Sequence, residues 1–98
     1  MDLAQLTAEM QRFVDSRGWS SDGTPKPQTQ RNLAISLVLE ASEVLELFQW
    51  VETPEAASEL ASELADVALY LLQLASVSGI DLERAVLEKL KMNYGREW

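Results

Sequence analysis

Two pairs of acidic residues lie within apolar helical stripes, and this placement limits how the chain can fold. Glu40 and Glu43 form one pair, and Glu63 and Asp66 form the other. At about 100° per residue of helix, Glu40 and Glu63 each project into the same arc as the leucines and valines of their own segment. A carboxylate buried without a partner loses its hydration at a cost of several kcal/mol. Each pair therefore needs protons, basic partners or a metal ion, and we interpret the two pairs as a metal site.

Length and composition indicate one globular domain that covers residues 1–98. Hydrophobic residues make up 47% of the chain, which is too many for a disordered protein. The chain contains no cysteine and no histidine, so disulfides, thiolate ligands, imidazole ligands and the usual general base are all excluded. A chain this short buries only a modest fraction of its surface, and helical bundles of this size often gain stability by forming oligomers.

The charge balance argues against polyanionic partners. The formal net charge is -8, from 16 acidic and 8 basic side chains. Such a field repels DNA, RNA and anionic membranes, so we expect neither a nucleic-acid polymer nor a membrane as a partner. We also identify no stretch long and apolar enough to span a bilayer, and no signal-peptide layout at the N-terminus. The expected location is the cytoplasm.

The spacing of apolar residues predicts four helices and no strands, which makes the fold class all-α: a four-helix bundle protomer that also oligomerises. Gly18 and Gly79 are expected to end the first and third helices. Thr53 and Pro54 have the residue types of an N-cap and a first helical position. The second helix is apolar on more than one side, which indicates more than one packing neighbour. The predicted helices cover residues 3–17, 30–52, about 54–78, and from the N-cap Asp81 to about Asn93 or Tyr94.

The two acid pairs predict a site for a hard cation. If their helices pack antiparallel, the pairs face one another and surround one small volume with carboxylate oxygens. Oxygen ligands suit Mg²⁺ or Mn²⁺, and Mg²⁺ commonly links carboxylates to substrate phosphates, which indicates a nucleotide ligand. Acids at this spacing are more often solvated, but the apolar flanks argue against that here. A di-iron bundle would need Glu-x-x-His, and the chain has no histidine. Glu46 lies off the Glu40 arc and is a minor candidate.

Several segments resemble the MazG-like nucleotide pyrophosphohydrolases. Residues 39–50 (LEASEVLELFQW) are similar to the first metal helix of that family, and residues 63–71 (ELADVALYL) to the second. Arg31-Asn32-Leu33 and Lys89-x-x-x-Asn93-x-x-Arg96 match as well, so the likeness runs from about Trp19 to Arg96. The E-L-F-Q-W sequence is typical of the small dCTP pyrophosphatase branch.

This resemblance implies hydrolysis of a nucleoside triphosphate, dCTP or a modified dCTP, to the monophosphate and pyrophosphate, as in sanitation of the nucleotide pool. It implies Mg²⁺, or Mn²⁺, held by Glu40, Glu43, Glu63 and Asp66, which are also the catalytic residues. It further implies a homo-oligomer, a tetramer rather than a dimer, with sites built between subunits. Because histidine is absent, a carboxylate must position the water or accept its proton.

Two alternatives remain open at the level of sequence. One is a pyrophosphatase of the same type with relaxed specificity. The other is a helical oligomerisation module without catalysis, which the small size and the broadly apolar second helix favour. Such a module would replace buried acids with Leu or Ile, whereas all four acids are present here.

The substrate contacts are expected from aromatic and amide residues at one end of the nucleotide and from basic residues at the other. Aromatic rings stack on bases at roughly 1–3 kcal/mol each, although plain core packing is the alternative for each ring. Trp50 would lie two turns beyond Glu43 on one helical face. An ordinary basic helix end is the alternative for the phosphate contacts. The expected base and sugar contacts are Trp19, Asn32, Trp50 and Tyr70, and the expected phosphate contacts are Lys89, Asn93 and Arg96.

The chain also departs from the dCTP-type pattern. Gln28 stands where these enzymes usually carry a histidine, and the segment between Trp19 and Arg31 is longer than usual. The tail reads R-E-W instead of R-Y-P. These differences affect base choice and the role of the loop, and they leave the metal residues unchanged.

Overall fold

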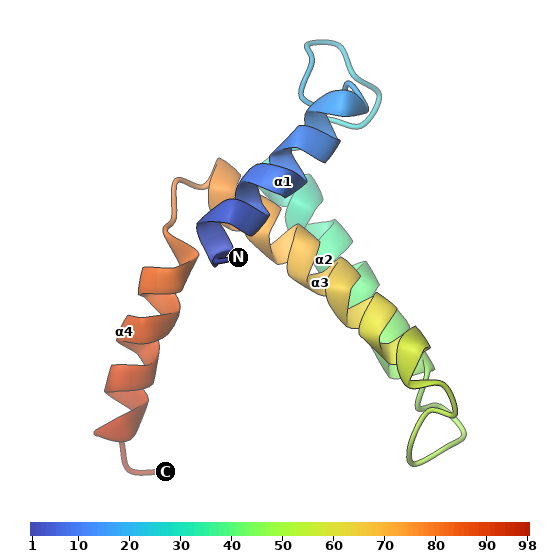
Figure 1. Cartoon of the computed structure of the whole chain (residues 1–98), viewed down its shortest axis with the longest axis vertical. Coiled ribbons are helices and arrows are strands. Elements are labelled where there is room, and N and C mark those ends of the chain that lie inside the picture. The colour runs from blue at the N-terminus through green and yellow to red at the C-terminus, as the bar shows by residue number, and fades with distance from the viewer.

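The computed structural model describes residues 1–98 as four α-helices without a strand (Figure 1). The predicted all-α fold with four helices is confirmed, and the last helix ends where the sequence indicated. The helices are α1 (Leu3–Ser16), α2 (Gln30–Glu46), α3 (Ala57–Val77) and α4 (Leu82–Tyr94).

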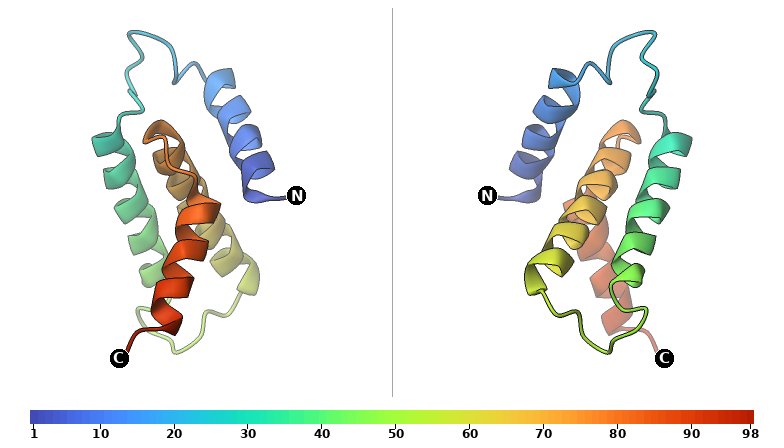
Figure 2. Two further views of the ribbon diagram at one scale, coloured as in Figure 1. Left: turned by 90° about the vertical axis from the view of Figure 1, so that its left-hand side faces the viewer. Right: turned by 90° about the vertical axis from the view of Figure 1, so that its right-hand side faces the viewer.

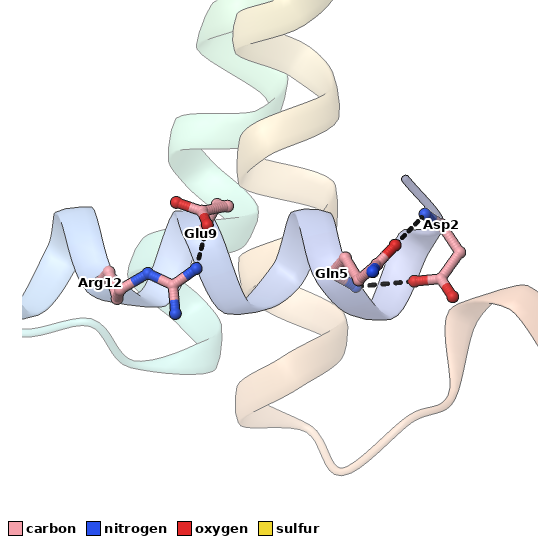
Figure 3. Close-up of polar contacts among 4 residues, drawn as sticks. All are labelled: Asp2, Gln5, Glu9 and Arg12. Carbon is pink, nitrogen blue, oxygen red and sulfur yellow. Dashed lines mark hydrogen bonds and ion pairs between the residues drawn. The ribbon is translucent and has the colours of Figure 1, made fainter.

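Local capping signals account for most helix ends. Asp2 and Gln5 form a reciprocal capping box at the start of α1, with both hydrogen bonds at 2.8 Å (Figure 3). Thr29 and Asp81 cap α2 and α4, because their side chains accept hydrogen bonds from backbone N–H groups of the first helical turn. Gly79 follows α3 with a φ of 68°, a left-handed conformation that glycine adopts without strain.

The connection between α2 and α3 differs from the prediction. The helix expected to reach residue 52 ends at Glu46, and the following N–H groups of Leu47 and Phe48 bond three residues back, in tight turns. Residues 48–51 are mostly aromatic or β-branched, and such residues lose side-chain freedom in a helix. The predicted cap at Thr53 and Pro54 is also wrong, since α3 begins at Ala57 after Ala56, which makes no side-chain cap.

The helices α2 and α3 lie side by side and run antiparallel, as the interpretation of the acid pairs required (Figures 1 and 2). The α1 helix packs against the C-terminal half of α3. Their contact forms a small core of Met10, Val14 and Leu72, against which Trp19 also packs. The α4 helix stands away from the α2–α3 pair and has no buried residue (Figure 1).

Little apolar surface is buried within one chain. Only six of the 98 residues are buried, and α2 exposes Val38 (67%) and Leu45 (71%) on its outer side. On α4, Leu87, Leu90 and Met92 are exposed as well. The second side of α2 that the sequence pattern assigned to a neighbour therefore has no cover inside the protomer.

The α3 helix is long and apolar enough to cross a membrane when judged by length and composition alone. The expectation that no such stretch exists is therefore wrong by this measure. A single helix of this kind is weak evidence for a membrane span, since core helices of soluble proteins have the same composition. Glu63 and Asp66 lie on α3, and each charge at the centre of a spanning helix costs about 2.5–3.5 kcal/mol.

Candidate metal and nucleotide site

Three of the four predicted metal ligands converge between α2 and α3. Glu40 and Glu43 on α2 and Glu63 on α3 each offer a carboxylate oxygen, and these oxygens lie within 4.8 Å of one another. Asp66 follows Glu63 by one turn of α3 and lines the adjoining cavity. The antiparallel packing of the two helices therefore gathers the acids into one volume, as their spacing predicted.

The acids of α2 and α3 are only partly exposed to water, and two of their oxygens are unmatched. Glu40 and Glu63 are half-buried, whereas Glu43 is exposed. Oε2 of Glu40 and Oε2 of Glu63 are both buried without a hydrogen-bond partner. A buried acceptor that is left unpaired loses the free energy of its hydration, and the loss is larger for a charged group. These two oxygens consequently favour a proton or a cation nearby.

The local electrostatics raise the pKa of two of these carboxyls. Burial raises the pKa of Glu40 first, followed by a hydrogen bond to Glu43 and the charges of Glu43, Asp66 and Glu63. For Glu63 the hydrogen bond to Glu43 raises the pKa most, followed by burial and the charges of Glu43, Asp66 and Glu46. Glu46, only a minor candidate by sequence, thus adds to the negative field of the site.

The donor set fits a hard divalent cation. All the groups that converge are carboxylate oxygens, which Mg²⁺ and Mn²⁺ prefer, and two of them lack any other partner. No base offsets their charge, since the two ion pairs of the chain, Arg12–Glu9 (Figure 3) and Arg84–Glu88, lie on the surface. The acid cluster would therefore be stabilised by a cation more than by anything within the protomer.

Two cavities have aromatic walls, and Asp66 lines one of them. One of about 290 Å³ lies under the 18–29 segment and is lined by Trp19, Asn32 and Tyr70, among others. The other, of about 300 Å³, lies between α1 and α3 and includes Trp19, Tyr70 and Asp66 in its wall. Trp19 and Tyr70 face both cavities, and Asp66 connects the second one to the acid cluster. Three of the predicted base-pocket residues thus line one cavity, and two of them, Trp19 and Tyr70, share the other cavity with Asp66.

Trp19 combines the two roles considered for it. Its ring meets Phe13 edge to face, with 5.7 Å between ring centroids, and it packs on the core of α1 and α3. Lys26 Nζ lies 5.3 Å from the centroid of the same ring. Asn32 is held by its Nδ2, which donates to the Pro27 carbonyl at 3.0 Å. The tryptophan therefore closes the end of the helix packing and also forms a cavity wall.

Four predicted substrate contacts lie elsewhere in the protomer. Trp50 is 87% exposed in the turns after α2, so the helical phase that placed it beyond Glu43 does not apply. Lys89 and Asn93 lie on α4, which stands away from the acids, and Arg96 follows that helix (Figure 1). The Arg96 guanidinium lies 4.2 Å from the centroid of the Trp98 ring. One protomer therefore presents the acids without these basic residues beside them.

One buried polar residue was not singled out by sequence. Gln73 is 5% exposed and is the only buried polar residue of the chain. Its Nε2 donates a 2.6 Å hydrogen bond to Oε1 of Gln28, 45 residues earlier. A glutamine in the middle of the otherwise apolar C-terminal half of α3 was the available signal.

The comparisons with known proteins agree with this geometry. Residues 35–97 match the MazG-like family. The dCTP pyrophosphatase 1 proteins of Rattus norvegicus and Homo sapiens are each 36% identical over 104 residues, covering 97% of this chain. The chain spans 56% of the length of these two relatives. A dATP/dGTP diphosphohydrolase of Salmonella phage PMBT28 is 33% identical over 92 residues, which is 93% of this chain and 27% of the phage protein.

A solved structure has the same fold. A pyrophosphatase from Archaeoglobus fulgidus superposes with a TM-score of 0.78 at 35% identity, covering 93% of this chain and 87% of that one. The family match covers the paired acids of α2 and α3 and all of α4. The resemblance seen in the sequence is thereby confirmed, and the chain belongs to the MazG-like family.

Proposed function

We propose that this chain acts as a nucleoside triphosphate pyrophosphohydrolase that converts a nucleoside or deoxynucleoside triphosphate to the monophosphate and pyrophosphate. The observation that carries the proposal is the carboxylate cluster, which has two unpartnered buried oxygens and lies beside an aromatic cavity. Acids in this arrangement favour a cation, and the ligand that such a cation commonly binds is a phosphate chain. The activities for which the relatives are named, dCTP pyrophosphatase and dATP/dGTP diphosphohydrolase, support the same reaction class.

The acids supply the chemistry at the phosphate end. Glu40, Glu43 and Glu63 would hold Mg²⁺, or Mn²⁺, together with Asp66. When bound, such an ion lowers the pKa of water and offsets the charge that develops on the phosphates. Water attacks the α-phosphorus, the bond from this phosphorus to the oxygen that leads to the β-phosphorus breaks, and pyrophosphate leaves. Because the chain has no histidine, one of the four carboxylates orients that water or takes its proton.

The preferred substrate is dCTP or a modified dCTP. The cavity of about 290 Å³ beneath the 18–29 segment has room for a nucleobase between Trp19 and Tyr70. The amide Nδ2 of Asn32 donates a hydrogen bond to the Pro27 carbonyl. Its Oδ1 is therefore free to accept a hydrogen bond from the exocyclic amino group of a cytosine base. The phage relative carries a name that specifies purine deoxynucleotides, so relaxed specificity is the enzymatic alternative.

The working form is a homo-oligomer of this chain, a tetramer rather than a dimer. The outer side of α2 and the apolar residues of α4 are exposed in one protomer, and a second copy would cover them. The acids also have no basic residue beside them within the protomer, although the phosphate chain of a substrate needs cationic partners. Packing α4 of one copy against another would bring Lys89, Asn93 and Arg96 to the acids.

The non-catalytic alternative is an oligomerisation module. The exposed apolar sides of α2 and α4 favour it, because they are what an assembly surface requires. The unpartnered oxygens of Glu40 and Glu63 argue against it, since they serve no purpose in helix packing and cost free energy.

A substrate panel tests the proposal. The protein is incubated with Mg²⁺ and each of the eight common ribonucleoside and deoxyribonucleoside triphosphates, and separately with a modified dCTP, and pyrophosphate and monophosphate are assayed. Pyrophosphate from dCTP alone would support both the reaction and the substrate. Pyrophosphate from several nucleotides would support the reaction but reject a preference for dCTP, and would favour the enzyme of relaxed specificity. Single phosphate, or no product from these or from modified dCTP, would overturn the proposal and favour the assembly module.

A further inference from the structure

A chain of amide hydrogen bonds links α3 to the segment that covers the base cavity. Gln73 on α3 donates from Nε2 to Oε1 of Gln28 at 2.6 Å, and Gln28 donates from Nε2 to the Lys26 carbonyl at 2.6 Å. Gln28 also lines the cavity that contains Trp19 and Asn32. The pair therefore joins the buried surface of α3 to the wall of the cavity proposed for the nucleobase.

The Lys26 carbonyl fixes the direction of this chain. A backbone carbonyl can only accept a hydrogen bond, so Gln28 must turn its Nε2 toward Lys26 and its Oε1 toward α3. Gln73 then has to present Nε2, which leaves its own Oε1 without a hydrogen bond in the protein. Reversing either amide would set two acceptors or two donors against each other. The chain is thus specific in orientation as well as in partners.

The Gln28–Gln73 bond is the one side-chain hydrogen bond between residues 18–29 and α3. The other side-chain hydrogen bonds that join the segment to residues outside it run to α1, where Ser20 donates to Asp15 at 2.6 Å, and to the neighbouring Asn32. A third cavity, of about 400 Å³, is lined by both Gln28 and Gln73. Gln28 therefore borders two cavities, so apolar packing alone does not fix this part of the loop.

We propose that Gln73 is a positioning residue which, through Gln28, holds the 18–29 segment against α3 and so sets the shape of the base cavity. The inference rests on the proposed function for its link to nucleotide binding. The Gln28–Gln73 hydrogen bond, called the clamp below, can be tested without any substrate. Gln73 does not touch the reacting atoms in this scheme. Its effect should appear in how well the base is bound and not in the rate of bond cleavage.

Substitution of the pair gives the test. Gln73→Leu keeps the approximate size of the side chain and removes the donor of the Gln28–Gln73 hydrogen bond. Gln28→Leu removes the acceptor of the same bond, at a half-buried position of the loop. Gln28→His is the rescue variant, because a neutral imidazole also offers one acceptor and one donor. Gln30→Leu is the matched control: it removes a 2.9 Å hydrogen bond between the start of α2 and Ser78 after α3, which faces solvent.

Two readouts separate the clamp from catalysis. Hydrogen exchange of the ligand-free protein should become faster in residues 18–29 in Gln73→Leu and Gln28→Leu and stay unchanged in Gln28→His and Gln30→Leu. With dCTP and Mg²⁺, the first two variants should raise KM about 3- to 10-fold with kcat nearly unchanged. The double Leu variant should be no worse than either single one, since both remove the same bond.

The outcomes that overturn the inference are equally specific. Unchanged exchange in residues 18–29 would show that the bond does not hold the segment. An equal rise of KM in Gln30→Leu would assign the effect to general loosening of the helix pair. Faster exchange without any change in KM would separate the clamp from nucleotide binding. If the unmodified protein cleaves no nucleotide, the proposed function fails by itself, and the exchange data still decide the clamp.

Discussion

At the scale of single residues, the site brings like-charged carboxylates together without a basic partner in the same chain. Glu40 and Glu63 keep one buried oxygen each without a partner, and both carboxyls have a raised pKa. The main cause is burial for Glu40 and the hydrogen bond to Glu43 for Glu63, and neighbouring acids add to both. A group whose pKa is raised on folding contributes stability that is present below its unfolded pKa and is lost as the pH rises through its folded pKa. Ionisation of these carboxyls therefore destabilises the metal-free protein.

The substitution Glu63→Gln should separate stability from activity. A permanently neutral amide removes the charge conflict, so the Tm of the metal-free variant should exceed that of the unmodified protein at pH 8. The difference should shrink as the pH falls below the raised pKa of Glu63. Turnover of dCTP should fall by about 100-fold or more, because the side chain no longer offers a carboxylate. Circular dichroism should show unchanged helix content, and a variant that unfolds instead would make the acid structural.

Metal addition should act in the opposite direction. Mg²⁺ at a concentration about 100 times its Kd stabilises a protein that binds it only when folded by about 2.7 kcal/mol. We expect millimolar Mg²⁺ to raise the Tm of the unmodified protein and to have a much smaller effect on Glu63→Gln. Equal shifts in the two proteins would place the ion away from the acid cluster.

At the scale of the helices, the parts that sequence predicts are those governed by local signals. The predicted cap Asp81 bonds the first turn of α4, which has its expected ends, whereas the caps Asp2 and Thr29 came from the structure. The end of α2 could not be read from periodicity, because apolar residues continue through Val51 while the backbone turns more tightly after Glu46. The meeting of the acids followed from spacing, whereas the role of Gln73 depends on a partner 45 residues away that no local pattern indicates.

Trp19 belongs to this scale because it joins α1, the 18–29 segment and α3. Trp19→Ala should lower the Tm, since it removes the contact with Phe13 and packing on the core, and losses of this kind cost about 3–5 kcal/mol when a ring is fully buried. The half-buried position predicts a smaller loss. KM for dCTP should rise more than kcat falls. A variant with normal KM would remove Trp19 from the base cavity.

At the scale of the whole molecule, the position of α4 is the feature that sequence leaves open. Its amphipathic pattern and caps define a helix but not the neighbour that covers it, and in the protomer it stands apart from α2 and α3 (Figure 1). The family match spans the segment that contains Lys89, Asn93 and Arg96, and their role as phosphate contacts stays a prediction. Because α4 stands away from the acids within one chain, we propose that a second copy completes the site.

Subunit mixing tests this arrangement. Arg96→Ala removes a proposed phosphate contact, and Glu63→Gln removes a carboxylate, so each variant alone should be inactive or nearly so. If α4 serves the site of a neighbouring copy, co-refolding the two variants should restore a substantial part of the activity, because some mixed sites contain neither change. Activity that stays at the level of the single variants would place all the residues of a site in one chain.

The exposed strip on α2 makes a separate prediction. Ala34, Ile35, Val38 and Leu39 line an open apolar depression on this helix. Leu39→Glu should shift the sedimentation of the protein from oligomer toward monomer, because a charge would be buried without a partner. Ala8→Glu on the exposed side of α1 is the control and should sediment normally. Normal sedimentation of Leu39→Glu would place the interface elsewhere.

The small core has a consequence for the life of a single chain. With six of 98 residues buried, an isolated copy has little internal packing to lose. In the proposed oligomer, separation of a copy from its neighbours and loss of its fold would therefore be one event. Dilution should then lower the melting point, and newly made chains should depend on meeting others soon after synthesis. At a low concentration of the protein in the cell, a smaller fraction of the chains would be folded and active. The rate of substrate turnover would then fall more steeply than the amount of protein.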